Sequence, residues 1–178
     1  MMTIVQTVSP DQASGKVAQI YGQLEQRFGR VHQGYQLYSA SPDLMEQIFQ
    51  QNGYYMQHPT LGFPLLALIR MLVSQQNDCA YCIGFNEAML IERGILTADQ
   101  VIAAKGDPST VPLSDKDKAM LLFVLKGTKD AKSIQVGDLD ALRALGWTDR
   151  DIVDGLFHGA RNAAVDIMFD AFKVENDF

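Results

Sequence analysis

Two cysteines, Cys79 and Cys82, are the residues of this 178-residue chain best suited to chemistry, because they are its only thiols and stand three positions apart. On a helix this spacing places both sulfurs on the same side. If Asn77 or Asp78 caps that helix, Cys79 falls in the first turn, where free backbone N–H groups favour a thiolate. The thiolate is the nucleophile, and the second thiol can resolve a sulfenic acid or a mixed disulfide. The pair therefore predicts a redox-active dithiol.

Two other interpretations of the pair stay open. Free cysteines behave as compact apolar residues, so the two can simply fill a tight contact between helices. Thiolates also bind zinc, but a structural zinc site needs four ligands. The chain has no second cysteine pair, and its histidines, His32, His58 and His158, stand far apart in sequence. We therefore expect no metal and no cofactor unless the fold or a symmetry mate gathers further ligands.

Helices are the elements that must position the cysteines. Ser-Pro-Asp at 9–11 and 41–43 signals two helix starts, and no segment alternates apolar and polar residues between hairpin turns. A core helix is expected over 63–76, the cysteine helix over 79–93 with Gly94 as a left-handed cap, and a last helix from Thr148-Asp149. The sequence predicts an all-α bundle of about seven helices, with residues 1–178 as one domain.

The last predicted helix carries an apolar stripe that we expect to face the core. It includes Ile152, Val153, Phe157 and Ile167 at helical spacing. His158 lies one position off this stripe, so we expect it to form an ordinary hydrogen bond. Between the first two helices, residues 30–40 are expected to be an ordered connection.

Charge and hydropathy exclude several classes of function. The formal net charge is −6 and no run of Lys or Arg is present, so nucleic acid and anionic membrane surfaces are not expected partners. The longest apolar run, 63–73, is eleven residues and contains Arg70. A membrane span needs about 20 apolar residues, so this run is expected to be a buried helix. The N-terminus has no secretory pattern, and we expect a cytoplasmic protein.

The run from Ile69 to Asn86 resembles the core of the alkylhydroperoxidase D-like, carboxymuconolactone decarboxylase superfamily. The likeness to its peroxidase-related members extends to residues 15–21, 29–31 and 41–42, and to 142–149 with the helix that follows. The resemblance implies a helical bundle that assembles as a homo-oligomer, a trimer or a hexamer. It also implies that Cys82 attacks the peroxide and that Cys79 resolves the product.

The chain departs from the pattern of the family's peroxidases at two positions. Those enzymes carry a His four residues after the second cysteine and a Glu twelve residues before the first, and here the positions hold Asn86 and Ala67. Asparagine cannot act as a general base near neutral pH, and alanine neither donates nor accepts a proton. Losing such a base commonly costs about two to four orders of magnitude in rate. We therefore expect an attenuated activity.

The candidate catalytic residues are Cys79, Cys82, Asn86 and Tyr81. Tyr81 can donate a hydrogen bond to a sulfur or a peroxide, or it can form a wall or an interface. Three neighbours have simpler interpretations. We expect Glu87 to be a solvated residue or a salt-bridge partner, and Arg70 to be a cation near the thiols or at a subunit contact. For His158 we expect only the ordinary hydrogen bond.

The expected function is that of a thiol-dependent peroxidase or thiol–disulfide oxidoreductase. Its substrate would be a small hydroperoxide or disulfide, and a thiol of unknown identity would reduce it again. Two alternatives remain. One is a non-redox lyase of the decarboxylase kind, and the other is a catalytically reduced scaffold or small-molecule-binding oligomer.

Overall fold

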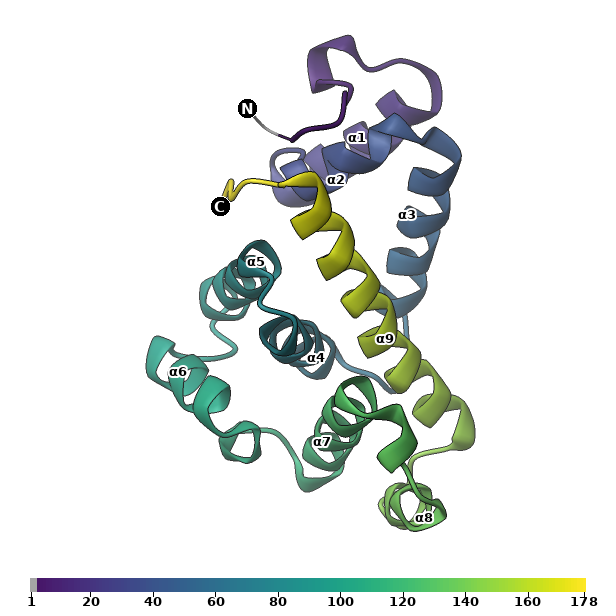
Figure 1. The fold of residues 1–178 in the computed structure, drawn as a ribbon, viewed down its shortest axis with the longest axis vertical. Coiled ribbons are helices and arrows are strands. Elements are labelled where there is room, and N and C mark those ends of the chain that lie inside the picture. Colours follow the sequence, from purple (N-terminus) through teal and green to yellow (C-terminus); the bar gives the residue numbers. More distant parts are fainter. Residues whose placement is uncertain (1–2) are drawn as a thin grey trace. The chain divides into compact units, whose positions relative to one another are not determined.

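The computed structural model describes residues 3–178, and over this range it is helical throughout, without a strand. The all-α class is therefore confirmed. The described residues form nine α-helices and four short 3₁₀ helices, more than the seven or so predicted. The α-helices are α1 (Gly15–Phe28), α2 (Gln33–Leu37), α3 (Pro42–Met56), α4 (Phe63–Gln76), α5 (Ala80–Glu92), α6 (Ala98–Gly106), α7 (Asp115–Lys129), α8 (Val136–Ala144) and α9 (Asp149–Phe172), labelled in Figure 1.

The described chain divides into two compact units. One contains the residues up to His58 together with Met168–Phe178, and the other contains Pro59–Ile167. The expectation of one domain over 1–178 stays a prediction. All the candidate site residues lie in the second unit.

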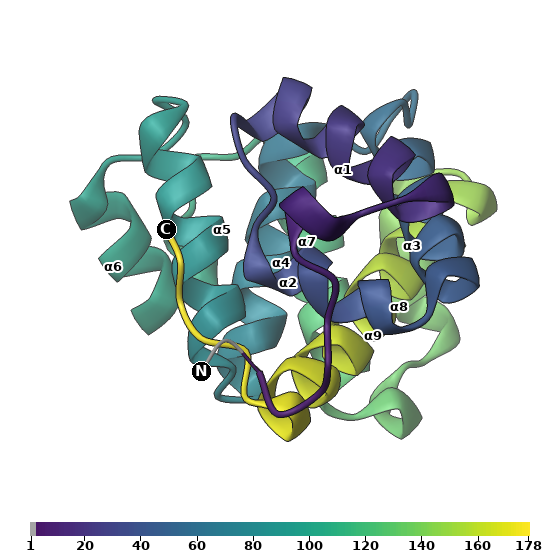
Figure 2. The same cartoon turned by 90° about the horizontal axis from the view of Figure 1, so that it is seen from above.

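In the first unit α1 packs against α3, as Figure 2 shows. The ammonium of Lys16 lies 2.7 Å from carboxylate oxygens of both Asp43 and Glu46 on α3. One predicted boundary is wrong: Pro10 begins a single 3₁₀ turn, and α1 starts only at Gly15, because the backbone at Ala13 is extended. The connection over 30–40 contains α2, which is too short to show a helical period in the sequence.

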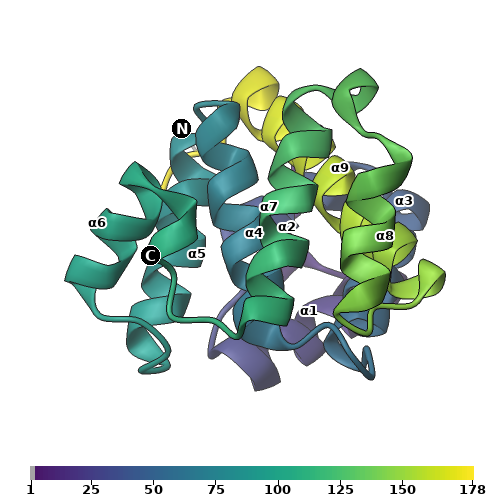
Figure 3. The ribbon, with the colours of Figure 1, turned by 90° about the horizontal axis from the view of Figure 1, so that it is seen from below.

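In the second unit α4 is the core helix, as predicted. It is flanked by α5 and α7, and α8 packs on α7 (Figure 3). Nine of its residues are buried, all of them between Leu65 and Ser74. Among residues 3–178, no helix combines the length and the apolarity that crossing a membrane would require.

The last helix begins as predicted, with the Thr148 hydroxyl accepting from the Asp151 N–H at 3.2 Å. Its buried face, however, is not the predicted one. Val153, Phe157 and Ile167 are 66%, 51% and 67% exposed. Ile152 is buried as predicted, but the other buried residues of α9 up to Asp166 are polar or small: Asp151, Gly155, His158, Gly159, Asn162 and Asp166.

Two glycines on this face explain the reversal. A Cβ on Gly155 would lie 2.8 Å from Met120 Sδ on α7, and one on Gly159 would lie 2.4 Å from Val124 Cγ1. Any larger residue would hold α9 away from α7. At this short separation His158, Asn162 and Asp166 reach hydrogen-bond partners on α4, which offsets the cost of burying them.

We expect Gly159→Ala to lower the free energy of unfolding. Overpacking of this kind costs about 1–3 kcal/mol, against a gain of up to about 1 kcal/mol in helix propensity. Urea unfolding followed by circular dichroism measures the difference. Gly22→Ala is the matched control, because no atom lies within 4 Å of its added Cβ. It should unfold at an equal or higher urea concentration, and a Gly159→Ala protein as stable as this control would contradict the packing described here.

Candidate functional site

The cysteine pair lies where α4 turns into α5. Asp78 occupies the left-handed region with a φ of 56°, and the next N–H, that of Cys79, donates to the Ser74 carbonyl at 3.1 Å. Cys79 itself is therefore the N-cap of α5, and Cys82 is its third helical residue. The prediction that Asn77 or Asp78 caps this helix is wrong, because the left-handed turn places both before the cap.

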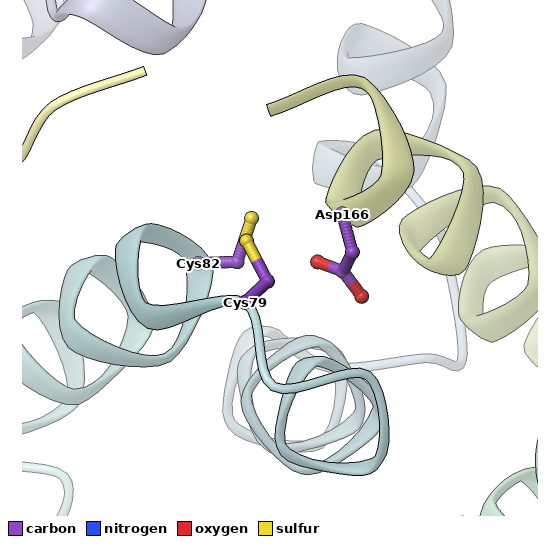
Figure 4. A group of neighbouring side chains, drawn as sticks. All are labelled: Cys79, Cys82 and Asp166. Atoms are coloured by element: carbon purple, nitrogen blue, oxygen red, sulfur yellow. The ribbon is translucent and has the colours of Figure 1, made fainter. Parts of the chain in front are cut away.

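The two thiols are free and buried, with exposed fractions of 0% for Cys79 and 5% for Cys82. The N-cap and third positions of a helix bring their side chains to the same side, as in a capping box. Figure 4 shows the two sulfurs side by side, with one oxygen of Asp166 extending toward them from the opposite helix. The closeness of the pair, predicted from its spacing, is confirmed.

Asp166 on α9 is a carboxylate that the sequence analysis did not identify. One of its oxygens and the two sulfurs all lie within 4.8 Å of one another, and the residue is only 1% exposed. Its Oδ1 accepts from the Ser74 hydroxyl at 2.7 Å, and its Oδ2 accepts from Asn77 Nδ2 at 2.9 Å. The turn that presents the cysteines thus also holds the carboxylate.

Asn162, one turn before Asp166, completes this network. Its Nδ2 donates to the Ser74 Oγ at 2.7 Å and lies 3.3 Å from each Asp166 oxygen. It also donates to the Arg70 carbonyl at 3.2 Å. A buried carboxylate requires such donors, because its desolvation is otherwise costly. Asp166 is therefore held in one orientation by α4 and by its own helix.

Cys82 has surroundings that favour its thiol form over the thiolate. Its pKa is raised well above the ordinary value, first because it donates a hydrogen bond to Cys79, then because it is buried, and then because Asp166 is negatively charged. The expected stabilisation of a thiolate in the first turn concerned Cys79, and it stays a prediction. For Cys82, burial and a neighbouring charge act against a thiolate.

None of the hydrogen bonds described for Asn86 reaches a sulfur atom. Asn86 is buried, its Nδ2 donates to the Cys82 carbonyl at 2.8 Å, and its Oδ1 accepts from Arg70 Nε at 2.7 Å. It therefore connects α4 to the backbone of Cys82. Tyr81 is also buried and stacks on Phe85 with an interplanar angle of 9°. This geometry suits a wall, and the catalytic roles of both residues stay predictions.

The other residues near the motif are accounted for by structural contacts. Glu87 pairs with Lys105 at 2.9 Å, as one of its two interpretations predicted. Arg70 lies between Asn86 and His158, with its Nη1 3.4 Å from the imidazole Nε2. His158 Nε2 lies 3.3 Å from the Leu66 carbonyl, so the expected hydrogen bond is confirmed. Ala67, at the family's Glu position, is fully buried in α4.

Over residues 3–178, Cys79, Cys82 and Asp166 form the one cluster of three metal-ligating side chains. A sequence signal for Asp166 did exist. His158, Asn162 and Asp166 recur every four residues, which places them on one helical face opposite the apolar stripe. Because the apolar stripe predicts that its own face is buried, the polar row was not predicted to be part of a site.

Three solved structures share this fold over nearly the whole chain. A peroxidase-related protein from Ralstonia eutropha JMP134, described as an alkylhydroperoxidase AhpD core, is 22% identical, with a TM-score of 0.86 over 99% of this chain and 93% of its own. A peroxidase-related protein from Silicibacter sp. TM1040 is 18% identical, with a TM-score of 0.87 over 99% and 92%. The debrominase Bmp8 is 15% identical, with a TM-score of 0.79 over 99% and 92%. Neither a family model nor a curated protein sequence matches the chain.

We expect Ser74→Ala to destabilise the protein by about 1.5–3 kcal/mol, because it removes a donor to a buried charge. Chemical denaturation of the reduced protein measures this loss. Ser109→Ala, at an exposed serine, is the control and should stay within about 0.5 kcal/mol of the unsubstituted protein. Equal stability of the two variants would show that Asp166 does not depend on Ser74.

Proposed function

Because the chain has the fold of the alkylhydroperoxidase D-like superfamily, we propose that it is a thiol-dependent oxidoreductase that reduces a small hydroperoxide or disulfide through Cys82 and Cys79. The observation that supports this most directly is the buried carboxylate of Asp166 beside both sulfurs. A dithiol alone is common in packing, but a dithiol directed at an oriented proton acceptor has the parts of a reaction centre.

Asp166 can replace the proton relay that Ala67 and Asn86 cannot form. A carboxylate within reach of a thiol accepts its proton as a general base. The transfer also leaves the charge of the site unchanged, because a thiol beside a carboxylate becomes a thiolate beside a carboxylic acid. A low-dielectric site therefore avoids the cost of holding two negative charges at once.

In the proposed cycle Asp166 takes the proton of Cys82, and the thiolate attacks the distal oxygen of the hydroperoxide. The O–O bond breaks, Cys82 becomes a sulfenic acid, and the proton leaves with the alcohol. Cys79 then attacks the Cys82 sulfur, which forms the disulfide and releases water. The net reaction converts the dithiol and hydroperoxide into a disulfide, an alcohol and water. An external thiol restores the dithiol by exchange.

Substitution of Asp166 tests this proposal. Asp166→Asn should slow peroxide-driven formation of the Cys79–Cys82 disulfide by about two to four orders of magnitude, because an amide cannot accept the proton. Mass spectrometry of alkylated samples, taken at intervals after peroxide addition, measures the rate. Cys82→Ser should form no disulfide.

Glu87→Gln is the matched control, because it removes a carboxylate from α5 that pairs with Lys105 instead of facing the sulfurs. It should keep the unsubstituted rate. Circular dichroism of each variant verifies folding. The check is needed because the side-chain NH₂ group introduced by Asp166→Asn would face one of two hydrogen-bond donors, the Ser74 hydroxyl or the Asn77 amide. No disulfide at near-millimolar peroxide in the unsubstituted protein would refute the proposal. Turnover of a substrate by a Cys79→Ala, Cys82→Ala protein would favour the lyase alternative.

The likeness to the debrominase Bmp8 suggests a second oxidant for the same dithiol. Replacing a carbon-bound bromine by hydrogen requires two electrons, which a dithiol supplies as it becomes a disulfide, with HBr as the second product. If this is the function, an anaerobic mixture of the reduced protein and a bromophenol should release one bromide per disulfide formed. Bromide detected by ion chromatography without disulfide, or from Cys82→Ser, would exclude it.

Two further properties belong to the proposal. A cycle that ends in a disulfide needs a supply of reducing thiols, which the cytoplasm provides. Assembly into a trimer or hexamer would cover the apolar residues that α9 exposes, Val153, Phe157 and Ile167.

A further inference from the structure

We infer that Cys79, Cys82 and Asp166 also form a binding site for a thiophilic divalent cation, of which Zn²⁺ is the best match. Each residue offers one ligand atom, all three are buried, and the atoms lie within 4.8 Å of one another. The sequence led us to expect no metal, because it has no second cysteine pair and its histidines stand far apart. The fold adds a ligand by bringing α9 to the start of α5. This inference goes beyond the proposed function, because binding requires no turnover.

The geometry is close to that of a zinc site. Zn–S bonds of about 2.3 Å and Zn–O bonds of about 2.1 Å place the ligand atoms of a tetrahedral site roughly 3.6–3.8 Å apart. The donors therefore need to approach one another by at most about 1 Å, which small side-chain rotations supply. Two thiolates with one carboxylate are a donor set of the kind that zinc accepts.

The surroundings of Asp166 resemble the outer shell of a metal site. Ser74 and Asn77 each donate to a different carboxylate oxygen, at 2.7 and 2.9 Å, and Asn162 lies 3.3 Å from both. An oxygen that binds the cation would give up its 3.3 Å contact with Asn162, whose Nδ2 keeps the Ser74 Oγ and the Arg70 carbonyl as partners. Outer-shell hydrogen bonds of this type fix the orientation of a ligand and raise metal affinity.

The charges of the site favour a cation. Binding would exchange two thiol protons for one Zn²⁺ and release both protons to solvent. Two thiolates and a carboxylate carry three negative charges, and the cation reduces them to one. Cys79 and Cys82 also stand at the N-terminal end of α5, where the N–H groups without an intrahelical partner can donate to thiolate sulfur.

Three protein ligands leave the fourth tetrahedral position for water, as in sites with an open coordination position. One consequence concerns the proposed cycle and therefore rests on the proposed function. Binding of the metal and formation of the Cys79–Cys82 disulfide exclude each other. Both sulfurs are either bound to zinc or bound to each other. Zinc would then protect the pair from oxidation until a chelator or a competing thiol removes it.

Metal titration of the reduced full-length protein tests the inference. The protein is treated with a chelator and a phosphine reductant, exchanged into anaerobic buffer, and titrated with Co²⁺ and then with Zn²⁺. We expect one Co²⁺ per chain, thiolate-to-cobalt charge-transfer absorption, and tetrahedral visible bands that Zn²⁺ abolishes. Cys79→Ser and Cys82→Ser should each lose the charge-transfer band, and Asp166→Asn should weaken binding at least about tenfold. Glu87→Gln is again the control and should bind as the unsubstituted protein does.

Three results would overturn the inference: no Co²⁺ or Zn²⁺ bound at micromolar concentration by protein whose thiols are verified as reduced, binding without charge-transfer absorption, or equal affinity in Asp166→Asn. These outcomes are independent of the peroxide assay, which is run with chelator present. A protein that binds zinc but is inert to peroxide would support this site and refute the proposed function. The reverse result would refute only the metal site.

Discussion

The carboxylate of Asp166 lies inside the second unit, and its hydrogen bonds account for much of the local structure. Burying a carboxylate is unfavourable unless donors replace the water it has lost. Here the donors come from Ser74 near the end of α4, from Asn77 in the turn, and from Asn162 on α9 itself. The same turn presents Cys79 as the cap of α5. The position of the thiols and that of the carboxylate are therefore set by one network.

Close packing of helices makes this network possible. Gly155 and Gly159 bring α9 so near to α7 that a methyl group at either position would overlap a neighbour. Short side chains such as Asn and Asp span the remaining distance to α4. The apolar residues on the other side of α9 are left exposed as a consequence. A polar row that would be unfavourable in an ordinary core is satisfied here, because each member finds a partner.

The chemistry of the site depends on how the negative charge of its thiols and its carboxylate is balanced, by protons or by a cation. Two thiols and a carboxylate in one buried place cannot all ionise without a counterion. A proton shared between Cys82 and Asp166 suits oxidation of the dithiol, because proton transfer moves the charge without adding to it. A divalent cation suits the fully ionised state. The two proposed states use the same three residues, and under these proposals the oxidant and the available metal decide between them.

The sequence by itself determined the helical class, the core helix over 63–76, the helix cap at Thr148, and the proximity of Cys79 to Cys82. These features depend on residues close together in the chain, where helical spacing and capping chemistry act directly. Only the tertiary structure decided which face of α9 is buried. Apolar residues form one stripe of that helix and polar residues another, and the contacts at Gly155 and Gly159 selected the polar one. The burial of this face brings Asp166 into the site. Its partners lie on elements distant in sequence, and no local pattern in the sequence encodes the contact between them.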